Sequence, residues 1–271
     1  MPQYLGGIMS FWGRSFVFNG VPSETYNVYI SSPDGGDVEI DASNTVEVLR
    51  QSIYRRVRPY LFGVAQNEIL TFPVSVNAPN ELTAVDSRLI QRWLFGHNNY
   101  KNLQIVQPDL QDVVMYAMMN NPKLKRNGNY IVGFTFDCEC DSPFGWTFPV
   151  TKTYTYTSNP NGAPIVFNNQ SDDNYYNYPI MEFTMDVFGG DLTIVNTSDN
   201  SRVFQFIGLA AGETVTVNNS LEILSSSTGL LRLSTFNKKF FRFVPGVNVL
   251  NVTGDISSLK FTYEFARKLG G

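Results

Sequence analysis

The sequence predicts a mainly β protein of two domains, with one α-helix among the strands of the first domain. Three observations carry this prediction. The chain has 21 phenylalanines and 14 tyrosines among 271 residues, and aromatic side chains suit the pleated, half-buried surface of a sheet. An Asn19-Gly20 turn pair divides an alternating apolar run near the N-terminus. The second half repeats short apolar runs without a helical pattern.

A β-hairpin is expected over residues 15–30, because Asn-Gly is the dipeptide that favours a two-residue hairpin loop. One or two strands should follow within residues 38–57, and another at residues 68–74, ended by a loop at residues 77–80. The apolar residues that alternate along the hairpin are Phe16, Phe18, Tyr26, Val28 and Ile30.

One helix is predicted after these strands. Thr83 and Asp86 have the spacing of a capping box, and Gly96 supplies a stop. We expect a helix of about 12 residues with one apolar face that packs against a sheet. The residues at helical spacing are Val85, Leu89, Ile90, Trp93 and Leu94.

Three further strands are expected in the first domain, with an Asn127-Gly128 turn between the last two. Thr and Tyr then alternate before a segment rich in Asn, Pro and Gly at residues 158–162, which has the composition of a linker. We therefore expect the first domain to end at Val150. The three strands are predicted at residues 103–106, 113–118 and 130–140.

The second half carries strand signals only. Its apolar runs recur every 8 to 14 residues or so and are divided by turn residues such as Gly189-Gly190 and Pro245-Gly246. This spacing predicts an antiparallel sandwich of two sheets. The expected strands lie at residues 178–188, 192–195, 203–207, 214–217, 221–224, 230–233, 247–252 and 259–265.

The charge content points away from several functional classes. Charged residues make up 16% of the chain, below the roughly 25% typical of soluble domains. The net charge is −4, and neither half is basic enough to suggest a nucleic-acid domain. No apolar stretch is long enough for a spanning helix, and the N-terminus lacks the pattern of a secretory signal. We expect synthesis in the cytoplasm, no membrane insertion, and uncharged surface that meets other protein.

Cys138 and Cys140 are expected to be buried free thiols. Alternation along residues 130–140 places both on the face of Phe134 and Phe136. Two residues along a strand separate the Cα atoms by about 6.6 Å, at the outer limit for a disulfide. With one histidine in the chain, a zinc site would need carboxylates or a partner chain. Metal or redox use is the alternative, and we predict no metal and no cofactor.

The sequence shows no catalytic motif. His97 follows the predicted helix beside no nucleophile motif, so a loop role is favoured over catalysis. The chain has 24 acidic residues, but no spacing favours one pair for glycoside cleavage. We predict that the protein is not an enzyme and that its function lies in assembly.

A basic cluster is the first candidate for a subunit interface. Arg55, Arg56 and Arg58 lie close together, with Arg50 before them. The plain interpretation is the solvated face of a strand, and the functional one is a salt-bridge surface between subunits. Nucleic-acid binding has little support, because four arginines in an acidic chain are few.

An apolar arm, residues 1–15, is the second candidate. Its aromatic and aliphatic residues, Phe11 and Trp12 among them, are too apolar to remain solvated, while its glycines argue against an independent fold. We expect the arm to dock on a neighbouring subunit; the alternative is an arm folded back on its own domain.

Several short motifs, taken in order along nearly the whole chain, resemble the distal tail protein family of long-tailed bacteriophages. The ordered series carries the resemblance, since each motif alone is common. The motifs are Phe16-x-Phe18-Asn19-Gly20-x-x-Ser23, Leu103-x-Ile105, Val113-Val114-Met115-Tyr116-Ala117, Phe134-x-Phe136-x-Cys138, Ser142-Pro143-Phe144, Tyr178-Pro179-Ile180, Leu192-Thr193-Ile194-Val195-Asn196, Gly212-Glu213 and Phe243-x-Pro245-Gly246-x-Asn248.

The resemblance implies a structural protein of the virion tail tip. Residues 16–150 would be a β-sandwich with one helix that forms a homohexameric ring, and residues 151–271 a galectin-like sandwich. The implied partners are the tail tube protein, the baseplate hub or tail-associated protein, and a receptor-binding protein, with DNA only passing through the channel. The arm is longer than usual for the family, and the chain is too short for an inserted carbohydrate-binding module.

A carbohydrate-binding β-sandwich module is the alternative function. Trp146, Tyr175, Tyr176 and Tyr178 are the aromatic residues that would stack on sugars. Such clusters near a linker are more often packing.

Overall fold

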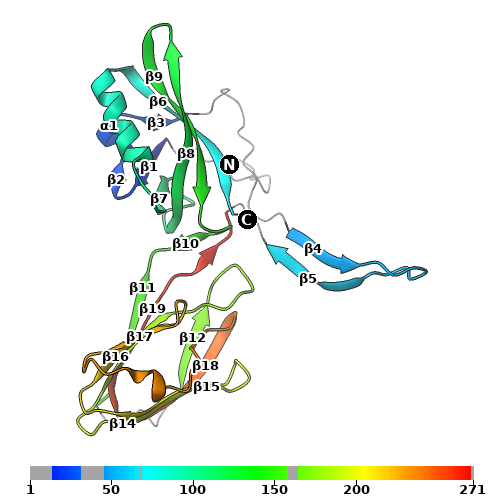
Figure 1. The fold of residues 1–271 in the computed structure, drawn as a ribbon, viewed down its shortest axis with the longest axis vertical. Helices are drawn as coiled ribbons and strands as arrows, with labels where there is room; N and C mark the ends of the chain where they lie inside the picture. The colour runs from blue at the N-terminus through cyan, green and yellow to red at the C-terminus, as the bar shows by residue number, and fades with distance from the viewer. Residues whose placement is uncertain (1–13, 32–45, 67–68, 158–163, 270–271) are drawn as a thin grey trace, which may run out of the picture. The chain divides into compact units, whose positions relative to one another are not determined.

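The computed structural model describes residues 14–31, 46–66, 69–157 and 164–269 (Figure 1). Residues 1–13 of the expected N-terminal arm, the first part of the strand region expected at residues 38–57, and the expected linker lie outside these ranges, whereas Ser15, the last residue of the expected arm, already belongs to β1. The fold is mainly β, as predicted, with antiparallel strand pairs and one α-helix among the described residues.

The chain divides into two compact units. The first comprises the chain up to Trp146 together with the residues from Arg267 onward, and the second spans Thr147–Ala266. The second unit is therefore inserted into the first, and the chain passes between them twice.

The first unit is built on a nine-stranded sheet. Seven strands follow the order β2-β1-β7-β8-β9-β6-β3, while β10 pairs with β8 and β20. The N–H of Ile30 donates to the carbonyl oxygen of Arg14 (2.8 Å), so the two ends of this path approach each other and the sheet curls around its core. The strands are β1 (Ser15–Phe18), β2 (Val21–Pro22), β3 (Tyr29–Ile30), β6 (Thr71–Leu82), β7 (Lys101–Val106), β8 (Val113–Asn127), β9 (Tyr130–Cys140), β10 (Gly145–Thr147) and β20 (Ala266–Arg267).

The hairpin expected over residues 15–30 is correct only in its first half. β1 and β2 pair around Asn19-Gly20, where both residues have positive φ. Tyr26, however, lies in the 3-10 helix η1 (Ser23–Tyr26), and Val28 lies outside the strands. Pro22 ends β2, because proline has no N–H to donate to a ladder.

Helix α1 (Ala84–Phe95) confirms the predicted length and the predicted cap. The hydroxyl of Thr83 accepts the N–H of Asp86 (3.1 Å), and the carboxylate of Asp86 accepts the N–H of Thr83 (3.0 Å). The Thr83 hydroxyl also donates to the Asp86 carboxylate (2.6 Å), and this bond, together with the one from the N–H of Thr83, lowers the pKa of Asp86 below its ordinary value. The cap is local in sequence, which is why the sequence alone predicts it.

The buried face of α1 is narrower than expected. Ile90 and Leu94 are buried, and Trp93 donates its indole N–H to the carbonyl oxygen of Phe18 in β1 (3.1 Å). Val85 and Leu89, predicted on this face, are instead exposed by 61% and 47%, because the buried face of the helix is formed by Ser87, Ile90, Trp93 and Leu94.

Strand β6 continues through the segment where a loop was expected. Residues 77–80 belong to the strand, and the register with β9 shifts between Asn77 and Leu82. At this point β6 and β9 approach closely: a Cβ added to Gly133 would lie 2.0 Å from the carbonyl oxygen of Val76. The Lys125 ammonium bridges the same segment by donating to Asn77 Oδ1 (2.7 Å).

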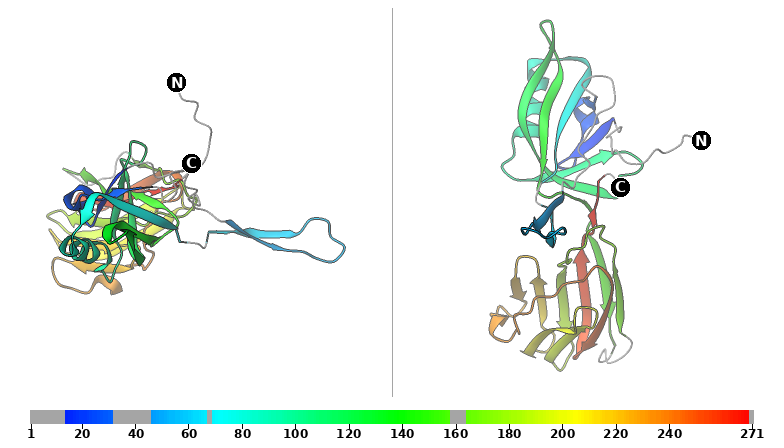
Figure 2. Two further views of the ribbon diagram at one scale, coloured as in Figure 1. Left: turned by 90° about the horizontal axis from the view of Figure 1, so that it is seen from above. Right: turned by 90° about the vertical axis from the view of Figure 1, so that its right-hand side faces the viewer.

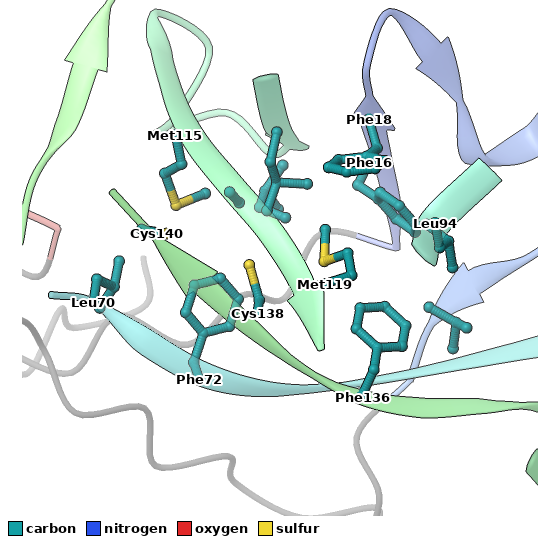
Figure 3. Packing of buried hydrophobic residues seen from close by; sticks show 14 of the residues in the cluster. Phe16, Phe18, Leu70, Phe72, Leu94, Met115, Met119, Phe136, Cys138 and Cys140 are labelled. Atoms are coloured by element: carbon teal, nitrogen blue, oxygen red, sulfur yellow. The ribbon is translucent and has the colours of Figure 1, made fainter. Parts of the chain in front are cut away.

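Both thiols are buried and free, as predicted. Cys138 and Cys140 share the inward face of β9 with Phe136, and Figure 3 shows the Cys138 sulfur among Phe72 and Met119. Burial raises the pKa of Cys138 well above its ordinary value, so this thiol is protonated at neutral pH.

Replacing either cysteine with serine is expected to destabilise the first unit by roughly 1 to 3 kcal/mol, because the hydroxyl would be buried among apolar side chains. Denaturant titration of Cys138→Ser and Cys140→Ser measures this cost. Chelators should leave the melting temperature unchanged, and a chelator-dependent shift would contradict the free-thiol assignment.

The second unit is the predicted sandwich of two antiparallel sheets (Figure 2). One sheet has the order β11-β19-β13-β16-β17 and the other β12-β18-β14-β15. Buried residues of both sheets form one aromatic-rich core, in which the rings of Phe167 and Phe243 stack at 3.8 Å. The strands are β11 (Val150–Thr155), β12 (Ile165–Asn169), β13 (Ile180–Met185), β14 (Gly190–Asn196), β15 (Arg202–Leu209), β16 (Thr214–Asn218), β17 (Ile223–Ser226), β18 (Gly246–Thr253) and β19 (Ile256–Tyr263).

Two features of this unit differ from the prediction. Residues 165–169 form β12, which the sequence analysis did not predict. Residues 230–233 do not form a strand; they lead into the short 3-10 helix η2 (Arg232–Ser234). Arg232 is buried there, whereas Leu231 is 92% exposed, the reverse of what the side chains alone indicate.

Candidate assembly surfaces

A hairpin of the first unit forms a sheet of its own. β4 (Val46–Gln51) and β5 (Tyr60–Gln66) pair with each other as a two-stranded sheet (Figure 1). β5 was not predicted. We call residues 46–66 the β4–β5 hairpin.

The β4–β5 hairpin exposes large apolar side chains. Isolated two-stranded hairpins are marginally stable in water, and they need a further surface to pack against. Burying one such side chain fully contributes about 1.5–3 kcal/mol. The most exposed side chains are Tyr54 (87%), Val57 (98%), Leu61 (67%) and Phe62 (67%).

The predicted basic cluster lies at the tip of this hairpin. Arg55, Arg56 and Arg58 belong to the connection between the strands rather than to a strand face, and Arg50 lies on β4. The Arg56 guanidinium lies 3.7 Å from the ring centroid of Tyr60.

Charge is unevenly divided between the hairpin and the rest of the chain. Of 20 basic and 24 acidic residues, the β4–β5 hairpin has four arginines and Glu47, which leaves 16 basic and 23 acidic residues elsewhere. The hairpin is therefore complementary in charge to the remainder of another copy. Phe11 and Trp12, the other predicted interface residues, lie outside the described residues.

A second apolar surface lies on the second unit and was missed by sequence reasoning. We call residues 227–235 the leucine strap; they follow β17 and include η2. Leu230, Leu231 and Leu233 are 58%, 92% and 49% exposed. The Leu230-Leu231 pair has the composition of a strand. In the structure Arg232 is buried and the leucines face outward.

The tyrosines considered for sugar binding are partly engaged in packing. The Arg242 guanidinium lies 3.7 Å from the ring centroid of Tyr176 and forms two hydrogen bonds to Asp199 (2.8 and 3.0 Å). One face of Tyr176 is thus covered. Tyr175 and Tyr178 are half-exposed, whereas Trp146 belongs to the first unit and donates its indole N–H to Ser142 Oγ (3.1 Å).

His97 has a packing environment. Its Nε2 lies 2.8 Å from the carbonyl oxygen of Trp93, and its ring meets Phe18 edge-on. In the described ranges, no group of three or more His, Cys, Asp or Glu side chains is arranged to hold a metal ion. The same ranges contain no helix long and apolar enough to cross a membrane.

Both β units have exposed apolar side chains, and the hairpin of the first unit adds exposed arginines. Such surfaces are typical of a structural component of an assembly. Two family models match the chain: a phage tail protein N-terminal domain over residues 11–142, and a phage tail C-terminal domain over residues 144–263. The chain belongs to this family of phage tail proteins.

Solved structures share the fold. The crystal structure of the SPP1 Dit (gp 19.1) protein, described as a paradigm of the hub adsorption apparatus in phages that infect Gram-positive bacteria, aligns with a TM-score of 0.69 at 12% identity and covers 93% of this chain and 98% of that one. A chain of the phage p2 baseplate in its activated conformation with Sr aligns with a TM-score of 0.52 at 7% identity, covering 88% and 90%. A comparison with curated protein sequences gives no match.

Proposed function

We propose that six copies of this chain form a ring at the tip of a long phage tail. The ring joins the tail tube to the baseplate hub and docks receptor-binding components. The protein acts without catalysis or cofactor, the first unit forms the ring, and the second unit, Thr147–Ala266, forms the outer sandwich. Within this proposal the protein is made in the host cytoplasm and becomes part of the virion.

The observation that carries the proposal is the β4–β5 hairpin. Its apolar side chains stabilise the protein only if another surface covers them. The burial must offset the roughly 4–15 kcal/mol that association costs in lost translational and rotational freedom. Several side chains like Val57 and Phe62, exposed by 98% and 67%, are needed to offset it.

The charge division favours a ring over a two-fold dimer. A two-fold contact in which the tips of two hairpins meet would bring Arg55, Arg56 and Arg58 close to their counterparts in the partner, which is repulsive. Docking of the basic hairpin on the acidic remainder of the next copy is a head-to-tail contact, and head-to-tail contacts close into rings when the rotation allows. An acidic ring also gives passing DNA little attraction to the channel wall.

Reversing the hairpin charge is expected to abolish the ring. In Arg55→Glu/Arg56→Glu/Arg58→Glu the hairpin would repel the acidic surface of the next copy, so light scattering should report monomers where the unchanged chain gives a larger species. Negative-stain images supply the symmetry.

The matched control changes the same number of charges on the other unit: Lys152→Glu/Lys238→Glu/Lys239→Glu, all three exposed. This control should retain the ring. If the hairpin variant assembles as well as the control, the hairpin is not the subunit contact.

A further inference from the structure

The leucine strap closes one side of the second unit. It runs from β17, the last strand of one sheet, to β15, the last strand of the other. The N–H of Ile207 donates to the carbonyl oxygen of Thr235 (2.9 Å), and the N–H of Asn237 donates to that of Gln205 (3.0 Å). The strap is thus fixed to the edge of β15.

A buried ion pair fixes the orientation of the strap. Arg232, 7% exposed, donates from Nε to Glu213 Oε1 (2.7 Å) and from Nη1 to the carbonyl oxygen of Gly208 (3.2 Å). The N–H of Ala210 and the hydroxyl of Ser226 also donate to the Glu213 carboxylate. With Arg232 turned inward, its neighbours in the strap turn outward.

Leu230, Leu231 and Leu233 of the strap form an exposed apolar group, which we call the patch. Scattered exposed aliphatic residues are ordinary, whereas a contiguous group marks an interaction site. The strap has no unpaired charge, because its only charged residue is Arg232. Ile207 on β15 (49% exposed) and Leu221 and Ile223 around β17 (65% and 59%) are further exposed aliphatic side chains on or next to the strands that the strap joins.

The backbone of β17 has one edge without a strand partner in the described residues, although η2 of the strap lies in contact with this strand. Within the described residues β17 pairs on one side only, with β16. Its other edge offers the N–H and C=O groups to which an extended segment can add as a further strand. The patch therefore fits an extended, apolar and uncharged segment, because a charged one would have to be desolvated there.

The chain itself contains such a segment in residues 1–13. The segment has no charged side chain, and two adjacent glycines allow it to follow an edge. Thirteen extended residues reach about 40 Å at most. Its apolar residues are Tyr4, Leu5, Ile8, Met9, Phe11 and Trp12.

We propose that residues 1–13 of one copy dock on the leucine strap and the open edge of β17 of a second copy. This inference rests on the proposed function in one respect: the second copy must be a neighbour in the assembly. The receiving surface is the leucine strap with the edge of β17.

A chain that begins at Arg14 and a synthetic peptide of residues 1–13 test the proposal directly. Binding calorimetry and the fluorescence of Trp12 in the peptide should both report saturable binding. Leu231→Glu in the receiving chain should weaken it at least tenfold. Val166→Glu is the matched control, because Val166 is exposed by 58% on β12, outside the patch, and it should change binding less than twofold.

The outcomes separate this proposal from the ring. Absence of peptide binding at millimolar concentration, or equal binding to Leu231→Glu, overturns the docking of the arm, whether or not the full chain still forms rings. Dimers of the shortened chain that Leu231→Glu dissociates would show that the strap contacts a second strap, which also overturns it. Loss of rings in the hairpin variant, with peptide binding intact, leaves it standing.

Discussion

Arg232→Ala is expected to lower the free energy of unfolding of the second unit by about 3–5 kcal/mol, because it leaves the Glu213 carboxylate buried without its partner. Glu213 is 1% exposed with Arg232 in place, so its charge is compensated by the guanidinium rather than by solvent. Urea titration followed by a signal from the second unit measures the loss. Lys260→Ala is the control, because it breaks a half-exposed ion pair with Glu182 (2.7 Å). It should lower the free energy of unfolding by about 1 kcal/mol or less.

The same pair predicts an acid transition. Burial by itself would raise the pKa of Glu213, but the hydrogen bonds from Arg232, Ser226 and the N–H of Ala210 lower it to about 2, against an ordinary value of 4.5. A carboxylate with a lowered folded-state pKa stabilises the fold above its unfolded pKa. That contribution, about 3 kcal/mol, is lost as the pH falls from 4.5 towards 2.

This loss can be assigned to the pair by a variant. Glu213→Gln/Arg232→Met should show a flatter dependence of stability on pH in this range. An unchanged pH dependence would contradict the assignment.

Gly133→Ala is expected to destabilise the first unit by about 3 kcal/mol, because the added methyl group would overlap backbone atoms that cannot move independently. Its carbon would lie 2.0 Å from the carbonyl oxygen of Val76 and 3.0 Å from the Cα of Asn77. β6 and β9 would have to separate, and the hydrogen bond from Lys125 to Asn77 would be strained with them. Denaturant titration measures the cost.

Gly20→Ala is the control for this substitution. Gly20 has a φ of 75°, yet nothing lies within 4 Å of an added Cβ, so only the left-handed backbone is penalised, by about 1–2 kcal/mol. Equal costs at the two positions would show that β6 and β9 tolerate the methyl group.

The sequence predicts best what neighbouring residues determine. Thr83, Asp86 and Gly96 are close to the helix that they bound, so α1 is predicted to the residue. β9 is also predicted with its bounds, because its alternation lasts for 11 residues. Alternation likewise places Cys138 and Cys140 correctly.

Features that depend on contacts between residues far apart in the sequence are not predicted. Leu230 and Leu231 have side chains typical of a strand. The ion pair between Arg232 and Glu213, 19 residues earlier, instead holds Arg232 inward and leaves the leucines exposed. β12 is recognised through its pairing with β18, about 80 residues later. The basic cluster was recognised as a candidate interface, whereas the exposed Leu61 and Phe62 of the same hairpin were not, because exposure is not visible in sequence.

The insertion of the second unit into the first has a consequence for how such tails diversify. The two crossing points are neighbours: β10 pairs with β20, and the N–H of Thr147 donates to the carbonyl oxygen of Phe265 (2.9 Å). A cassette whose two ends are hydrogen-bonded to each other can be exchanged for another, or for a tight turn, without displacing the strands that flank it. Exchange of the second unit would therefore leave the nine-stranded sheet of the first unit intact.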